Sequence, residues 1–215
     1  MPFGSQRLAR AVLLTFLSLA ALAPPAGAAS SIVLPRTGQV GIGISSAYGT
    51  FLPTGELGDE FGAGPGISVR IRYRMRFERA IGLTFDAERM NSREPSNGEG
   101  AFDSLTDVPP VFRDRMKMVT AGIEFYQMFD TRDRTVKYLS AGLGLAQISA
   151  HLTDGETQYP IAGDALFLSV GAGFERFFFR SWAWDANFKY KPVLHDGKVN
   201  HDLQVQLGLI FYAAY

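Results

Sequence analysis

Apolar and polar side chains alternate without a break from residue 67 to residue 77, and four of the polar positions are arginine. Successive side chains of a β-strand point to opposite faces, so this segment predicts one apolar and one cationic face. Stacked cations need counter-charges, and an unbroken apolar face needs apolar surroundings. The apolar face is Ile67, Val69, Ile71, Tyr73, Met75 and Phe77, and the cationic face is Arg70, Arg72, Arg74 and Arg76.

Seven further segments show the same alternation, so the chain as a whole predicts eight strands. In most of them the second face carries glycine, serine or alanine. A soluble barrel is the alternative, but its wet face would carry Lys, Glu and Thr, whereas small residues fit the narrow bore of an eight-stranded barrel. The strands are predicted at 39–48, 67–77, 79–90, 116–128, 139–146, 166–175, 182–190 and 203–211.

The connections between these segments alternate in length. Those at 78–79, 130–134 and 179–180 are short, whereas those at 50–65, 91–115, 153–164 and 194–202 are longer. Short turns at one end and long loops at the other are typical of outer-membrane barrels, with both termini in the periplasm. The predicted fold class is therefore all-β, an eight-stranded antiparallel up-and-down transmembrane β-barrel.

Residues 1–28 have the pattern of a cleaved secretory signal peptide. Arg7 and Arg10 precede a short apolar run, and Ala26-Gly27-Ala28 forms a small-residue cleavage site. The apolar run is shorter than the ~20 residues that a membrane-spanning helix needs. We therefore expect the barrel to comprise residues 29–215, as one domain.

Charge and cysteine content exclude several function classes. Without Arg7 and Arg10, the 21 basic residues fall to 19 against 21 acidic ones. This near balance gives no electrostatic basis for binding nucleic acid. The chain has no cysteine, which excludes disulfides and thiolate metal sites.

The last predicted strand carries the most specific similarity to a known family. The chain resembles the small eight-stranded outer-membrane barrels, namely the OmpA-type transmembrane domain and the opacity-type porin-like proteins. Members of this class end in an alternating apolar strand with a terminal aromatic residue, usually phenylalanine, that the outer-membrane assembly machinery recognises. The resemblance implies that this signal consists of Leu207, Leu209, Phe211 and Tyr215.

The alternation assigns five charges of each sign to the interior of the barrel. If Phe77 lies opposite Ile81, Arg72 faces Asp86 and Arg70 faces Glu88 across the second and third strands. Buried ions must be paired, so these charges form either a structural ion-pair network or a gated ion path, and structural pairing is favoured. The predicted network is Arg70, Arg72, Arg74, Arg76, Asp86, Glu88, Glu124, Glu175, Asp185 and Lys189.

The three histidines raise the possibility of a lipid-modifying enzyme. His151, His195 and His201 all fall near the long-loop end. Acyl transfer requires a nucleophile, a base and an orienting acid within hydrogen-bond reach, and no serine of the wall lies beside them in the pattern. The sequence therefore predicts no catalytic residues, no metal site and no cofactor.

The functional prediction is a monomeric, non-enzymatic outer-membrane barrel of a Gram-negative bacterium with a plugged lumen and a structural or surface-recognition role. Its partners would be outer-membrane lipid, lipopolysaccharide and the assembly machinery, and the 91–115 loop is a candidate site for a surface ligand. A narrow channel for ions or small solutes is the first alternative. A lipid-modifying enzyme of the outer membrane is the second.

Overall fold

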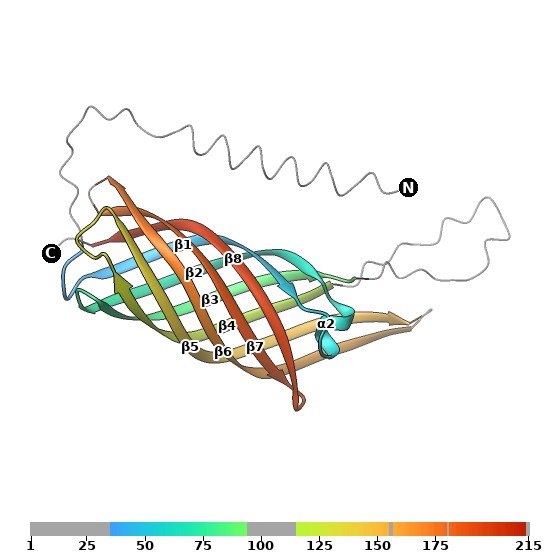
Figure 1. The fold of residues 1–215 in the computed structure, drawn as a ribbon. Coiled ribbons are helices and arrows are strands. Elements are labelled where there is room, and N and C mark those ends of the chain that lie inside the picture. The colour runs from blue at the N-terminus through green and yellow to red at the C-terminus, as the bar shows by residue number, and fades with distance from the viewer. Residues whose placement is uncertain (1–34, 94–114, 155–156, 180, 214–215) are drawn as a thin grey trace, which may run out of the picture. The chain divides into compact units, whose positions relative to one another are not determined.

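The chain forms a closed barrel of eight antiparallel strands in a computed structural model, which describes residues 35–93, 115–154, 157–179 and 181–213. Each strand pairs with the next, and the last strand closes the ring against the first (Figure 1). The predicted signal peptide lies outside the described residues. The elements are β1 (Val40–Phe51), α2 (Glu56–Glu60), β2 (Ala63–Arg76), β3 (Arg79–Asn91), β4 (Arg115–Phe129), β5 (Thr135–Asp154), β6 (Thr157–Phe179), β7 (Trp182–His195) and β8 (Lys198–Tyr212).

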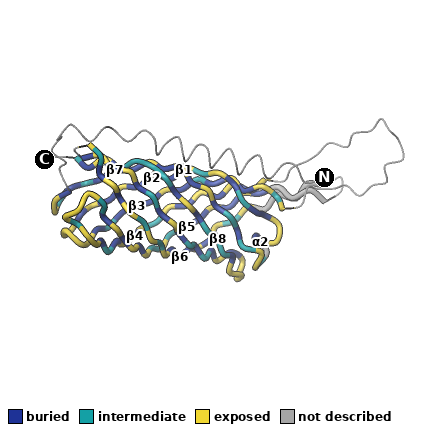
Figure 2. Tube along the Cα trace, turned by 45° about the horizontal axis from the view of Figure 1, so that its top comes forward, coloured by how far each residue is buried: buried dark blue, intermediate teal, exposed yellow. Residues whose placement is uncertain are grey.

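The two faces of the strands differ in burial as the alternation predicts. Figure 2 shows buried and exposed positions following one another along the strands. On β5 the outward Leu145 is 62% exposed, whereas on β2 the inward Arg72 is fully buried. The barrel therefore has its apolar side chains outside and its charged and small side chains inside, and the predicted all-β fold is confirmed.

Glycines bring the inner walls of neighbouring strands close together. Gly122 of β4 lies directly opposite Gly144 of β5. A Cβ at Gly144 would lie 2.6 Å from the Cα of Gly122 and 2.7 Å from the ring of Phe167, closer than real side chains approach. The absence of side chains here lets Phe167 pack across the wall into the lumen.

Two of the predicted long loops are wrong, because the strands continue through them. β7 and β8 pair as far as His195 and Lys198, leaving only Asp196 and Gly197 as the turn. Both turn residues have positive φ (47° and 75°), as a type I′ hairpin requires. The Asp-Gly pair is the sequence signal for this turn.

The predicted loop at 153–164 is likewise a hairpin, in which Asp154 pairs with Thr157. The hairpin accommodates Pro160 because β6 pairs with β7 only as far as Leu166, so the β7 side of β6 is an edge at Pro160. Proline is tolerated on such an edge because its missing N–H leaves no ladder hydrogen bond unmade.

The two ends of the barrel carry different parts of the chain. The terminal end is where β1 begins and β8 ends, with Gly41 paired to Tyr212. The distal end carries α2 and the β7–β8 turn. At the terminal end Trp182 packs against Phe211 with ring centroids 5.0 Å apart, and Trp184 packs against Phe178. These residues form an outward aromatic group, whereas Phe177 is buried inside.

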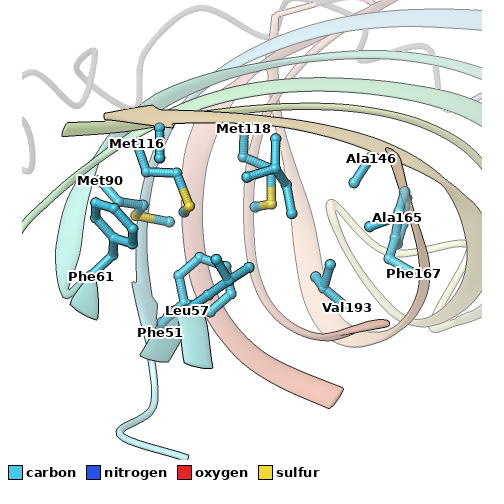
Figure 3. Close-up of a cluster of buried hydrophobic side chains, with 12 residues drawn as sticks. Phe51, Leu57, Phe61, Met90, Met116, Met118, Ala146, Ala165, Phe167 and Val193 are labelled. Carbon is cyan, nitrogen blue, oxygen red and sulfur yellow. The ribbon is translucent and has the colours of Figure 1, made fainter. Parts of the chain in front are cut away.

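Apolar side chains fill the lumen toward both ends. The distal cluster packs Leu57 of α2 and its neighbours against methionines of β3 and β4 (Figure 3). Asn200 fixes α2 by accepting a hydrogen bond from the backbone N–H of Leu57 at 2.9 Å. The terminal cluster comprises Ala80, Tyr126, Met128, Val136, Tyr138, Phe177, Ala183, Ile210 and Tyr212.

Among the described residues, no helix has the length and apolar character needed to cross a membrane.

Replacing Gly144 by valine tests the close packing of the inner wall. The new side chain would meet backbone atoms of β4, which cannot move aside as a flexible side chain can. We expect a loss of about 3 kcal/mol in the free energy of unfolding, near the upper end for overpacked cores. Urea unfolding of the detergent-folded barrel measures this. Leu145→Val on the outward face is the control, and equal losses in both variants would contradict the packing account.

Candidate functional site

The lumen holds a continuous set of buried charged side chains between the two apolar clusters. Among the described residues, five lysines and arginines and six carboxylates are buried there. They come from β2, β3, β4, β6, β7 and β8, because alternate positions on each of these strands face inward. The set is Arg70, Arg72, Arg74, Lys189, Lys191, Asp86, Glu88, Glu124, Glu175, Asp185 and Asp202.

The group nearest the terminal end is centred on the carboxylate of Glu175. It forms ion pairs with both Arg72 and Arg74 of β2, the latter at 3.2 Å. The hydroxyl of Tyr212 donates to the same carboxylate at 2.9 Å. The guanidinium of Arg72 also lies over the ring of Tyr126, 3.9 Å from its centroid. One carboxylate is thus shared by two arginines, and each guanidinium also lies over an aromatic ring.

Two neutral pairs occupy the middle of the lumen. The first joins Arg70 to Asp185, which also accepts a hydrogen bond from the Tyr138 hydroxyl at 2.7 Å. The second joins Lys189 to Glu124 at 2.6 Å. In both pairs the partners come from strands on different sides of the ring. These ion pairs therefore cross the bore and tie its walls together.

In the group nearest the distal end, several carboxylates surround a single cation. The ammonium of Lys191 contacts Glu88, lies 3.1 Å from Asp202 and lies 3.7 Å from Asp86. Gln204 adds a hydrogen bond to Glu88 at 2.7 Å. Three carboxylates thus share one ammonium, so acidic groups outnumber basic ones here. At Glu175 basic groups outnumber acidic ones.

The predicted pairing across β2 and β3 is wrong. Arg72 lies opposite Gly82, and Arg70 lies opposite Thr84. The turn between these strands is two residues long and closes on Arg76 and Arg79, and an irregularity between Arg74 and Arg76 restores the alternation. This slides β3 four residues from the predicted register, so the arginines find their partners across the barrel.

Arg76 does not belong to the lumen, contrary to the prediction. It is exposed at the terminal end, whereas Arg70, Arg72 and Arg74 are buried. The same irregularity that shifts the register breaks the alternation just before Arg76. A strict period of two therefore fails at the last residue of the strand.

Lys191 and Asp202 are lumenal residues that the sequence interpretation missed, because it ended the seventh strand at residue 190 and began the eighth at residue 203. The two residues lie directly opposite each other on β7 and β8. The alternation that places residues 185, 187 and 189 on the inner face also places residue 191 there, so this alternation could have identified Lys191. The lumenal tyrosines were also missed, because a tyrosine ring is compatible with both the lipid-facing and the inward side of a strand. They are Tyr126, Tyr138 and Tyr212.

The histidines do not gather into one site. His195 is buried on the lumenal side of β7, where its ring lies against Gly163. His201 is on the outward-facing positions of β8, where its ring stacks on that of Tyr190 and Nδ1 lies 2.5 Å from the tyrosine hydroxyl. The side chain of His151 lies outside the described residues. Among the described residues, no group of three or more His, Asp or Glu is placed to hold a metal ion.

Part of the predicted assembly signal lies on the last strand of the ring. Leu207, Leu209 and Phe211 alternate along β8, and Tyr215 lies outside the described residues. Of the candidate 91–115 loop, residues 94–114 also lie outside the described part of the chain.

The closed ring of eight strands matches solved membrane barrels. Neisserial surface protein A is 17% identical, with 80% of this chain and 96% of that one covered and a TM-score of 0.55. Ail of Yersinia pestis, solved with the heparin analogue sucrose octasulfate, is 14% identical over 83% and 100% of the two chains, with a TM-score of 0.54. OprG of Pseudomonas aeruginosa is 10% identical over 86% and 100%, with a TM-score of 0.52.

The chain has the fold of the small eight-stranded outer-membrane barrels. No family model matches its sequence, and a search of curated proteins finds no match. The similarity to these barrels therefore lies in the fold and not in the sequence.

Because three carboxylates share the one ammonium of Lys191, two substitutions in this group should differ strongly in their cost to stability. Lys191→Met leaves three buried carboxylates without their cation, and breaking a buried pair in this way costs about 3–5 kcal/mol. Asp202→Asn removes one of the carboxylates that compete for the ammonium, so we expect a change of less than about 1 kcal/mol. Urea unfolding in detergent measures both. Equal destabilisation by the two variants would contradict the shared-cation arrangement.

Proposed function

We propose that this protein is a sealed, non-conducting outer-membrane barrel that stabilises the envelope and presents its distal end outward for recognition. It would reach the outer membrane by way of a cleaved signal peptide at residues 1–28. Its lumenal charges would be structural, holding the strands together across the bore. It would be neither a channel nor an enzyme.

The arrangement of the lumen is the observation that carries this proposal. The buried ion pairs lie between two apolar clusters, one at each end, and Leu57, Phe51 and Phe61 fill the distal one (Figure 3). Hydrated ions would have to cross both clusters to reach the charges. Dehydrating an ion inside an apolar cluster costs several kcal/mol, so the clusters oppose conduction.

The outward surface supports a location in the membrane. Large apolar side chains on it are extensively exposed on every strand, from Ile42 on β1 to Val205 on β8. Soluble proteins rarely expose such continuous apolar area, whereas a lipid bilayer covers it. With short turns in the periplasm, the distal end and the 91–115 loop face outward. The complex of Ail with the heparin analogue sucrose octasulfate supports, through the shared fold, a recognition role.

A narrow channel is the first rival. It would place the same charges along a gated path, with Arg72 as a switching partner of Glu175. Planar-bilayer recordings distinguish the two functions. We expect no discrete conductance steps from the wild type or from Arg72→Ala, with a porin in the same bilayer as positive control. Reproducible wild-type steps that vanish in Arg72→Ala would support the channel and overturn the sealed barrel.

A lipid-modifying enzyme is the second rival. His195 and His201 lie on opposite sides of the wall, and His201 is engaged by Tyr190, so neither supports a shared catalytic group. Mass spectra of lipid A from cells that overproduce the barrel test this rival. We expect them to be unchanged, and a new acylation state that depends on the protein would favour the enzyme.

Placing an arginine in the apolar belt tests the proposed location. Val205 is an outward residue near the middle of β8 and is 53% exposed. An arginine at mid-bilayer costs ~2–4 kcal/mol in such barrels, against ~0–1 near the interface. We therefore expect Val205→Arg to reduce the heat-modifiable folded barrel in the outer-membrane fraction, and Val199→Arg, next to the distal turn, to leave it near the wild-type amount. Normal folded amounts of Val205→Arg would contradict the proposal.

A further inference from the structure

Three cations gather on the outward face of β3 and β4 near the distal end. Arg89 of β3 lies directly opposite Lys117 of β4, and Arg115 is the next outward residue of β4. All three side chains are exposed. Like charges directly opposite each other on neighbouring strands destabilise a sheet unless something of opposite charge lies between them.

No counter-charge for these cations is found in the part of the chain that the structure describes. None of the described ion pairs uses Arg89, Lys117 or Arg115. Their outward neighbours Asn91 and Ser149 are uncharged. By contrast, the exposed Lys137 at the terminal end pairs with Asp130 at 2.9 Å. Within the described part of the chain, these three cations therefore have no carboxylate partner.

Their position along the barrel sets the depth of that anion. The outward face of β3 is apolar from Ile81 to Ala87, and Arg89 is the next outward residue. On β4 the apolar outward face begins at Val119, immediately after Lys117. The cations thus stand where the apolar belt stops. In a membrane this is the level of the lipid headgroups.

We propose that Arg89 and Lys117, with Arg115 beside them, bind a phosphate of a phosphorylated glycolipid in the outer leaflet. This inference rests on the proposed outer-membrane location with the distal end outward. The lipid fits because the same strip offers apolar contact below the cations, on Phe85 and Val119, for its acyl chains. A free phosphate would gain nothing from that contact. A guanidinium can hold two phosphate oxygens at once, and the lysine adds a mobile point charge.

Lipid binding to the folded full-length mature protein in neutral detergent tests the site. Native mass spectrometry measures the binding of lipid A, the phosphorylated anchor of lipopolysaccharide, to wild type and variants. We expect Arg89→Gln/Lys117→Gln to weaken binding about tenfold or more, since two charge-assisted contacts are lost. The matched control is Arg79→Gln/Arg176→Gln, which removes two exposed arginines at the terminal end and should bind like wild type.

A second variant separates loss of binding from loss of folding. Lys117→Glu places an acidic residue directly opposite Arg89, so it should fold at least as well as wild type on a heat-modifiability gel. It should nevertheless bind lipid A at least about tenfold more weakly. Equal lipid A binding by wild type and Lys117→Glu would overturn the site.

Two competitors identify the source of the anion. Dephosphorylated lipid A should bind wild type about as weakly as phosphorylated lipid A binds Arg89→Gln/Lys117→Gln. Inorganic phosphate at equal concentration should not displace lipid A. Full displacement by phosphate, or undiminished binding of the dephosphorylated lipid, would overturn the proposal. Because binding is measured on folded protein, its failure is independent of whether the barrel is found in the outer membrane or conducts.

Discussion

The narrow bore of a closed eight-stranded ring constrains everything else in this protein. Closing the sheet removes every free strand edge from the membrane-spanning part, but it brings the inward side chains of all strands together. Each inward position must therefore be small, like Gly122 and Gly144, or pack into an apolar cluster, or, if charged, be paired with a partner from elsewhere in the ring. Arg70, Arg72 and Arg74 fit inside only because carboxylates on β6 and β7 meet them there.

The ion pairs are arranged unevenly along the bore. Basic groups are in excess around Glu175 near the terminal end, neutral pairs follow in the middle, and acidic groups are in excess around Lys191 near the distal end. Buried charges of this kind add little net stability over a well-packed apolar core, but removing one partner is costly. The network consequently specifies which strands face each other, while the glycine contacts and apolar clusters at the ends fill the remaining space.

Much of the fold could be predicted from the sequence because a period of two is a local property. The eight alternating segments identified every strand, and parity assigned residues such as Glu124 and Asp185 to the buried inner face. The incorrect predictions concerned contacts between residues far apart in the sequence. The register of β3 against β2 depends on an irregularity between Arg74 and Arg76 that no pattern reveals, and Arg70 meets Asp185, more than a hundred residues away, only because the ring closes. Lys191 and Asp202 were missed because the predicted seventh strand ended at residue 190 and the predicted eighth began at residue 203, whereas β7 and β8 continue past both residues.

Arginine accessibility tests the inside-out arrangement most directly. Phenylglyoxal modifies solvent-accessible guanidinium groups, and mass spectrometry of the digested protein identifies the modified residues. In the folded barrel in detergent, Arg70, Arg72 and Arg74 should remain unmodified while Arg76 and Arg79, exposed on the same hairpin, react, and all five should react after unfolding. Modification of Arg72 in the folded protein at the rate of Arg79 would contradict a lumen of buried ion pairs.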